Sequence, residues 1–127
     1  MIRLFGASET VRIVTTTAAP VSVLAVYSDY DGVSASQGKQ RTSISSATTT
    51  TVISAPGVNG DRIVHGMTIR NTHASLATTV TVQDYDGTTA TEIYRVTLAA
   101  GEQAIFSRAS GWTYFNAQGQ PKESQSQ

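Results

Sequence analysis

The stretch that decides the fold runs from Arg62 to Phe106 and reads RIVHGMTIRNTHASLATTVTVQDYDGTTATEIYRVTLAAGEQAIF. Apolar and polar side chains alternate through it in short runs, and a period of two is the signature of a half-buried β-strand. Turn segments separate these runs at Asn71–Ser75, Asp84–Gly87 and Ala99–Glu102. The stretch is therefore predicted to form an antiparallel β-meander.

The first run of this stretch also predicts which side chains face the core. Strict alternation points one set inward and the other outward: Ile63, His65, Met67 and Ile69 against Arg62, Val64, Thr68 and Arg70. His65 is accordingly expected to be a hydrogen-bonded core or interface residue. A metal site is not favoured, because the only other histidine is His73 and the sequence offers no third ligand at a typical spacing.

Composition restricts the class of protein more than it restricts the function. The 127 residues predict one domain, residues 1–117, followed by a polar flexible tail, residues 118–127. There are no cysteines, so neither a disulfide framework nor a thiolate metal site is expected. Nine basic and nine acidic residues balance, and no basic stripe of the kind found in nucleic-acid binders is visible. No apolar run approaches the ~20 residues of a membrane span, and the N-terminus lacks the apolar stretch of a signal peptide.

Strands are also predicted on both sides of the central stretch, at Glu9–Thr17, Val21–Ser28, Thr48–Ser54 and Trp112–Phe115. Residues 33–46 are polar and are predicted to form a long surface loop, with room for an edge strand. About eight short strands with turn signals between them, and no helical period, indicate an all-β fold. An antiparallel β-sandwich or jelly roll is expected, with a small barrel as a further possibility.

The tetrapeptide Asp-Tyr-Asp-Gly occurs twice, at Asp29–Gly32 and Asp84–Gly87, each time after an alternating strand. One interpretation is a calcium loop, but an earlier aspartate ligand is missing in both copies. The favoured interpretation is a pair of hairpin turns, because aspartate suits the start of a turn and glycine supplies a positive φ. The candidate turn residues are Asp29, Gly32, Asp84 and Gly87.

Catalytic patterns are weak. The sequence has no G-x-S-x-G elbow and no carboxylate pair beside a histidine, so no enzyme activity and no cofactor or metal are expected. The aromatic residues Trp112, Tyr114 and Phe115 could form a sugar-stacking platform, but a tryptophan in a terminal strand is more often part of the core.

Five segments of the chain resemble small structural proteins of tailed bacteriophage virions. They are TTTTVISAP at 48–56, RIVHGMTIRNT at 62–72, TVTVQDYDG at 79–87, LAAGE at 98–102 and GW at 111–112. The resemblance covers residues 48–116 best, and these motifs are structural. It implies a β-sandwich or jelly-roll module, trimeric in many cases, of the capsid decoration or cement type. It carries over no catalytic residue.

The resemblance implies a non-enzymatic protein on the outer surface of the head, assembled in the host bacterial cytoplasm. Its expected partners are copies of itself and the major capsid protein or another virion protein. A tail, collar or head-fibre component and a carbohydrate- or receptor-binding module are the alternatives. The candidate contacts with the shell or with a neighbouring copy lie in three segments: Ile2, Leu4, Phe5, Leu24, Val26, Lys39 and Arg41.

The segment Val21–Val26 is apolar on both of its alternating faces, since Leu24 and Val26 add to the second face. A two-layer sandwich of this size needs such a face only where something covers it. A closed cyclic assembly with this strand at or near the subunit contact is therefore expected, and a trimer is the form that the resemblance suggests.

Overall fold

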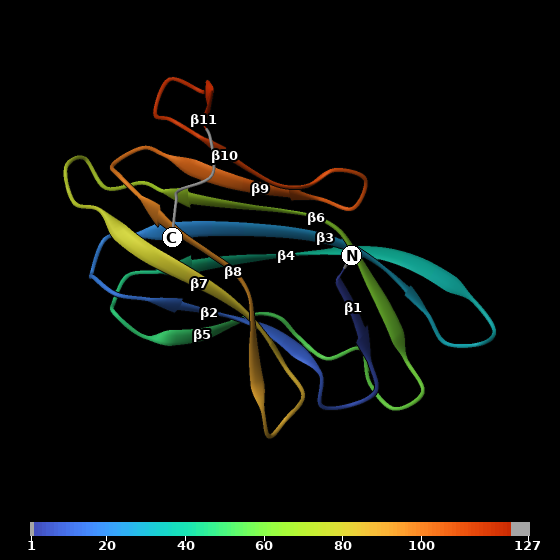
Figure 1. Cartoon of the computed structure of the whole chain (residues 1–127). Helices are drawn as coiled ribbons and strands as arrows, with labels where there is room; N and C mark the ends of the chain where they lie inside the picture. The colour runs from blue at the N-terminus through green and yellow to red at the C-terminus, as the bar shows by residue number, and fades with distance from the viewer. Residues whose placement is uncertain (1, 123–127) are drawn as a thin grey trace.

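Two antiparallel sheets packed face to face make up the computed structural model, which describes residues 2–122 (Figure 1). The larger sheet has the strand order β11-β10-β9-β6-β3-β4, and β1 also pairs with β6. Its strands are β1 (Ile2–Phe5), β3 (Val21–Tyr30), β4 (Ala35–Ile44), β6 (Asp61–Asn71), β9 (Gln103–Ser107), β10 (Gly111–Phe115) and β11 (Pro121–Lys122). The smaller sheet has the order β5-β2-β7-β8. Its strands are β2 (Thr10–Thr15), β5 (Thr49–Ile53), β7 (Thr78–Tyr85) and β8 (Ala90–Leu98).

The prediction of an all-β antiparallel sandwich is confirmed, because residues 2–122 form strands and turns and contain no helix. It follows that no helix in this part of the chain could cross a membrane. The core lies between the sheets and is built by alternation, with every second residue buried throughout β2 and in the first part of β3 and β7. Its largest fully buried side chains include Leu4, Ile13, Ile53, Met67, Ile69 and Leu98. Burying an aliphatic side chain of this size contributes about 1.5–3 kcal/mol.

A β-bulge at His65 divides β6 into two parts with opposite alternation. Val26 of β3 pairs with Gly66 and Tyr27 pairs with Val64, so His65 has no partner on β3. An extra residue in one strand reverses which side chains face the core. The inward prediction is therefore confirmed for Met67 and Ile69, which follow the bulge and are buried.

Before the bulge, the predicted facing is wrong. The buried residues there are Arg62 and Val64, while Ile63 and His65 lie on the outer face and are half-buried. The burial of Arg62 is possible because Asp29 accepts two hydrogen bonds from it, from Nε at 2.7 Å and from Nη2 at 2.9 Å. The guanidinium also donates to the Ser54 carbonyl and lies 3.9 Å from the Tyr27 ring centroid. A buried charge is tolerated when it is paired and hydrogen-bonded in this way.

The predicted loop at residues 33–46 is mostly a strand. β4 pairs with β3 at ten consecutive positions, from Tyr30 opposite Ala35 to Val21 opposite Ile44. Its polar sequence reflects its position at the edge of the seven-stranded sheet, where most of its side chains stay exposed. Composition alone suggested a loop because an edge strand with little burial needs few apolar residues.

The two Asp-Tyr-Asp-Gly copies form equivalent hairpin turns, one between β3 and β4 and one between β7 and β8. In each, Oδ1 of the second aspartate accepts two backbone N–H groups, from Val33 and Ser34 to Asp31 and from Thr88 and Thr89 to Asp86. Gly32 and Gly87 take φ values of 93° and 99°, so their predicted turn role is confirmed. Asp29 and Asp84 lie inside the strands, and for them the turn assignment is wrong.

Both ends of the described chain are more ordered than predicted. β1 adds a short strand beside β6, from Ile2 opposite Val64 to Phe5 opposite Asp61. At the other end, Asn116 closes a turn by accepting from Gln118 and Gln120, and β11 then pairs with β10. The predicted flexible tail is therefore wrong for residues 118–122, and residues 123–127 lie outside the described residues.

Candidate docking surface

Four of the predicted contact residues meet on the outer face of the seven-stranded sheet. Leu24 of β3 lies opposite Arg41 of β4, and Val26 lies opposite Lys39. All four point away from the core, because the alternate residues Val21, Val23 and Ala25 are the buried ones. Leu24 is half-buried and Val26 is 41% exposed, so two apolar side chains lie beside two cations.

Two further cations extend this group across the sheet. Arg70 of β6 is exposed and lies opposite Ser22 of β3. This pair is two residues along the strands from the pair of Leu24 and Thr68, so all four side chains are on the same face. Arg108, in the turn between β9 and β10, donates its backbone N–H to the His65 carbonyl and lies over the same face. We call the set Leu24, Val26, Lys39, Arg41, Arg70 and Arg108 the docking face. Sequence reasoning treated Arg70 only as an outward residue and did not single out Arg108. The alternation around Thr68 was the signal for Arg70, whereas Arg108 follows Ser107 in a turn, where no alternation marks it.

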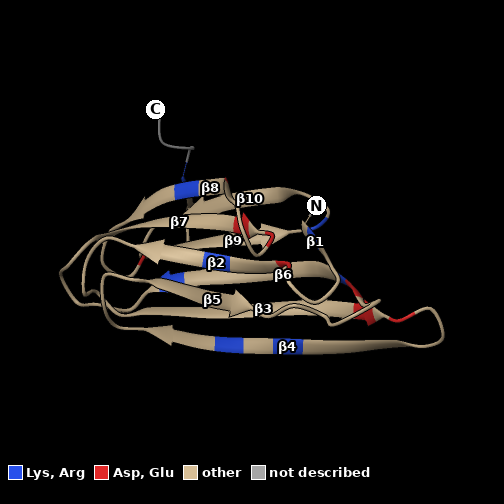
Figure 2. Ribbon diagram, turned by 90° about the horizontal axis from the view of Figure 1, so that it is seen from below, with Lys and Arg blue, Asp and Glu red and all other residues tan. Residues whose placement is uncertain are grey.

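The cations of the docking face have no acidic partner among the described residues 2–122. Among residues 2–122, the ion pairs join Arg3 to Asp61, Arg62 to Asp29, Arg95 to Glu92 and Lys122 to Glu102. Asp61 is the one acid at an outward strand position of this sheet within those residues, and Arg3 holds both of its oxygens. Figure 2 shows Lys39 and Arg41 as two blue bands on β4, at the edge of the sheet. A chain with zero net charge thus carries a locally cationic face.

Four of the eight described acidic residues lie on the side of the smaller sheet. Glu9, Asp84, Asp86 and Glu92 lie in or beside β2, β7 and β8, where Arg12 and Arg95 are the described cations. Arg95 is paired with Glu92, and Arg12 lies 3.7 Å from the Tyr85 ring centroid. Among the described residues, the outer face of the smaller sheet therefore has no group of unpaired cations like that of the docking face.

A shallow hollow of about 260 Å³ lies at one side of the docking face, lined by Val26, Gln37, Gly38 and Lys39. Gly38 is needed here because the Tyr27 ring approaches its backbone from the core side; a Cβ at this position would lie 2.8 Å from the ring. An apolar centre surrounded by charged groups is the usual anatomy of a protein interface.

The predicted contacts near the N-terminus separate into two kinds. Ile2 is 6% exposed and Leu4 is fully buried, so both belong to the core and cannot meet a partner. Phe5 is 53% exposed and lies opposite Asp61 at the far end of the same outer face. The error arose because a terminal apolar segment that completes a sheet has the same composition as one that docks elsewhere.

A serine and a histidine also come together on this face, but their geometry does not fit an activated nucleophile. Ser28 Oγ lies 2.5 Å from His65 Nε2, and Arg108 Nη1 lies 3.3 Å from His65 Nδ1. A guanidinium can only donate, so Nδ1 accepts and the ring proton is on Nε2. Nε2 then donates to Ser28 and cannot take its proton. In a catalytic triad a carboxylate orients the histidine from the opposite side, where this chain has a cation.

The aromatic residues of the last strands belong mainly to the interior. Tyr114 is 4% exposed; its hydroxyl donates to Glu102 Oε1 and lies 3.1 Å from the Thr97 carbonyl. Trp112 is half-buried and stacks on Tyr94, with ring centroids 4.2 Å apart and 3° between the planes. The described residues include no group of three or more histidine and acidic side chains placed to hold a metal ion.

Comparison of the chain with family models, with curated proteins and with solved structures finds no match.

Proposed function

We propose that this chain is a non-enzymatic structural protein of a tailed bacteriophage virion, a capsid decoration protein that binds the outside of the head. The observation that carries the proposal is the docking face, in which four cations without acidic partners surround two apolar side chains on a sheet. The resemblance of residues 48–116 supports the virion setting. The partner would be the major capsid protein or another protein of the shell.

The chemistry of the docking face supports an adhesive role. A β-sheet paired across several strands fixes the backbone and the direction of its outward side chains, so binding orders only the side chains themselves. Cations that already lack partners gain them when an acidic surface approaches, and they speed the encounter by electrostatic steering. The apolar centre then contributes by losing its contact with water. Contacts of this kind would bridge neighbouring shell subunits and resist internal pressure from packaged DNA.

Sedimentation with expanded heads that lack the protein tests this proposal. The wild-type chain is expected to sediment with the heads at micromolar concentration, and binding should weaken as salt is added. Arg41→Glu reverses one charge of the docking face and should weaken binding by about tenfold or more. Arg95→Glu makes the same charge change on the opposite sheet and should bind like the wild type.

Two results would count against the proposal: no association of the wild-type chain with heads, or equal losses in Arg41→Glu and Arg95→Glu. Copy number per particle then separates the possible locations. Hundreds of copies would indicate decoration of the head, whereas a handful would indicate a collar or tail component with the same adhesive surface.

A further inference from the structure

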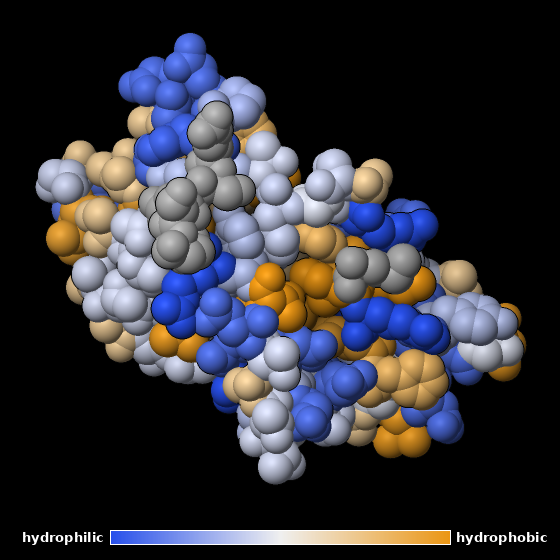
Figure 3. Space-filling view, viewed as in Figure 1, coloured by the Kyte–Doolittle hydropathy of each residue, from blue (hydrophilic) through white to orange (hydrophobic). Residues whose placement is uncertain are grey.

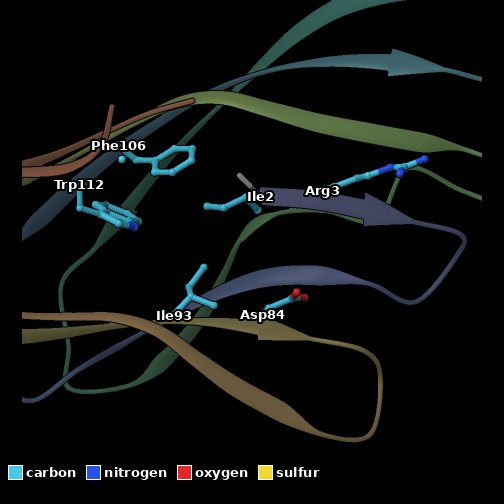
Figure 4. A pocket seen from close by; sticks show the side chains of 7 residues that line it. Ile2, Arg3, Asp84, Ile93, Phe106 and Trp112 are labelled. Carbon is cyan, nitrogen blue, oxygen red and sulfur yellow. The ribbon is translucent and has the colours of Figure 1, made fainter. Parts of the chain in front are cut away.

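A cavity of about 390 Å³ opens between the two sheets, on a different side of the molecule from the docking face (Figure 4). Its apolar walls are Ile2 of β1, Ile93 of β8, Phe106 of β9 and Trp112 of β10. In Figure 3, hydrophobic atoms gather at the centre of the view, in the region where Figure 1 shows the space between β8 and β1. The volume is at the small end of the range for ligand pockets, enough for one small ring.

The cavity exists because β8 leaves the sandwich at a second bulge. Val82 pairs with Tyr94 and Gln83 pairs with Glu92, so Ile93 has no partner on β7. Beyond this point, residues 90–92 of β8 are exposed, and the β7–β8 hairpin extends away from the sandwich (Figure 1). The core therefore lacks a covering strand between β8 and β1.

A carboxylate without a partner faces this space. Asp84 continues the inward row of Val80 and Val82, which are both fully buried, and it pairs with Val11 on β2. No hydrogen bond or ion pair joins its carboxylate to another residue in 2–122. Desolvation by burial, and then the nearby charges of Glu9 and Asp86, raise the pKa of Asp84.

The other copy of the tetrapeptide provides an internal comparison. Asp29 occupies the same position as Asp84 in its repeat and also points inward, but Arg62 neutralises it with two hydrogen bonds. Within residues 2–122, the fold therefore supplies a partner for one inward aspartate and none for the other, which faces a cavity. A half-buried polar group without a partner calls for an explanation other than stability.

A donor lies across the cavity from this acceptor. Tyr94 covers one face of the Trp112 indole, and in Figure 4 the nitrogen-bearing edge of the ring points into the space toward Ile2. The indole Nε1–H makes no hydrogen bond within residues 2–122. The lining of the cavity thus combines apolar walls with an indole donor and a carboxylate acceptor, neither of which has a partner among residues 2–122.

We infer that this cavity binds a single sugar ring, such as the terminal residue of a glycan. A sugar has apolar C–H surfaces for the aliphatic and aromatic walls. A hydroxyl can both donate and accept, so one hydroxyl of the sugar can donate to the Asp84 carboxylate while another accepts from the Trp112 indole. An organic cation would satisfy Asp84 but would leave the indole N–H without an acceptor. The inference does not rest on the proposed head-binding role, since the docking face is elsewhere.

The chain has one tryptophan, so its fluorescence and its single indole N–H resonance report on this cavity alone. Glucose, galactose, mannose, rhamnose and N-acetylglucosamine would be titrated into the full chain at millimolar concentrations. At least one is expected to shift both signals in a saturable way. Asp84→Asn should weaken that binding by about tenfold or more, because a charge-assisted hydrogen bond is lost.

Glu92→Gln is the matched control, because it removes one negative charge from a neighbouring exposed position on β8 outside the cavity lining. It should bind like the wild type, and both variants would first be checked for folding by circular dichroism. The inference is overturned if no sugar shifts the wild-type indole resonance, if glycerol shifts it equally, or if arginine methyl ester binds and the sugars do not. The wild-type measurement decides the matter even if Asp84→Asn fails to fold.

Discussion

At the scale of single residues, two aspartates in equivalent positions show how context sets the role of a charge. Asp29 and Asp84 both precede the sequence Tyr-Asp-Gly and both point into the sandwich. Arg62 pairs with Asp29, whereas Asp84 faces a cavity and has no cationic partner among residues 2–122. The first aspartate therefore belongs to the structure, and the second is available for binding.

This difference predicts opposite effects on stability. Asp29→Ala leaves Arg62 as a buried charge without a partner and should cost about 2–3 kcal/mol, less than a fully buried pair because Asp29 is partly exposed. Asp84→Ala should leave the free energy of unfolding at pH 7 unchanged or higher, because the raised pKa of Asp84 means that the folded state disfavours its charge. Urea unfolding of both variants provides the measurement. A larger loss in Asp84→Ala would contradict the assignment of Asp84 as a residue free for a ligand.

Glu102 provides the residue-scale prediction about pH. Burial alone would raise the pKa of Glu102, but hydrogen bonds from Tyr114, the Ala99 N–H and Lys122 outweigh it and lower the pKa. A carboxylate whose pKa is lowered on folding stabilises the protein above its unfolded pKa of about 4.3. That stabilisation is lost as the pH falls through the unfolded value and then the folded one.

Glu102→Gln should therefore cost about 1–3 kcal/mol at pH 7, and its difference from the wild type should shrink when the pH falls below about 4. Thermal melts across this range would show it. Glu92→Gln, which changes an exposed acid, should follow the wild type at every pH. The difference in stability between Glu102→Gln and the wild type could instead stay constant with pH. Glu102 would then stabilise the fold through the shape of its side chain and not through its charge.

At the scale of elements, two β-bulges interrupt the regular alternation of the strands and change which side chains face the core. The bulge in β6 turns His65 outward and places Arg62 inside, where it can meet Asp29. The bulge in β8 frees Ile93 and opens the cavity between the sheets. Bulges commonly re-aim side chains beside functional sites in this way.

The β6 bulge predicts unequal effects at two isoleucines of one strand. Ile63 and Ile69 are six residues apart, so simple alternation places both on the same face. Because His65 interrupts the pairing, Ile69 is fully buried and Ile63 is half-buried on the outer face. Ile69→Ala should cost about 2–5 kcal/mol, and Ile63→Ala only about 1 kcal/mol. Thermal melts of the two variants test the register. Equal losses of stability would contradict the reversal of facing at the β6 bulge.

At the scale of the whole molecule, the positive charge of the docking face decides what it can meet. Two docking faces placed against each other would bring Lys39, Arg41, Arg70 and Arg108 together with their equivalents, and like charges repel across an interface. The face therefore requires an unlike surface. In a cyclic trimer each contact is between different surfaces, so the expected trimer is compatible with this requirement.

The oligomer prediction concerns Leu24. The isolated chain is expected to be a trimer near neutral pH, with strand β3 at or near the subunit contact. Leu24→Asp would place a charge in that contact and should weaken assembly more than it weakens the fold. Light scattering of the wild type and the variant measures the mass, with Ser22→Asp on the same face as the control.

Three outcomes are informative. A wild-type mass of one chain at micromolar concentration would contradict the trimer. An intact trimer in Leu24→Asp together with lost binding to heads would assign the docking face to the shell. Loss of assembly in Ser22→Asp alone would move the subunit contact along β3.

The sequence by itself determined the fold class, most of the strands and the two equivalent turns. These follow from local signals: alternation of period two, β-branched residues, and aspartate and glycine where a tight turn needs them. It also predicted Leu24, Val26, Lys39 and Arg41 as contact residues, and these four proved to be neighbours on one face.

Tertiary structure alone decided where the facing of side chains reverses and which surfaces form, because local periodicity does not predict how distant strands pair. A single unpaired residue such as His65 or Ile93 reverses a facing pattern, and only the register of the neighbouring strand reveals it. Only the tertiary structure shows that Ile2 and Leu4 are buried in the core. Only the structure, likewise, shows that Asp29 is paired with Arg62 while Asp84 has no partner among residues 2–122. Although positive and negative charges balance along the chain, the strand register brings several cations together on one face, and this creates the docking face.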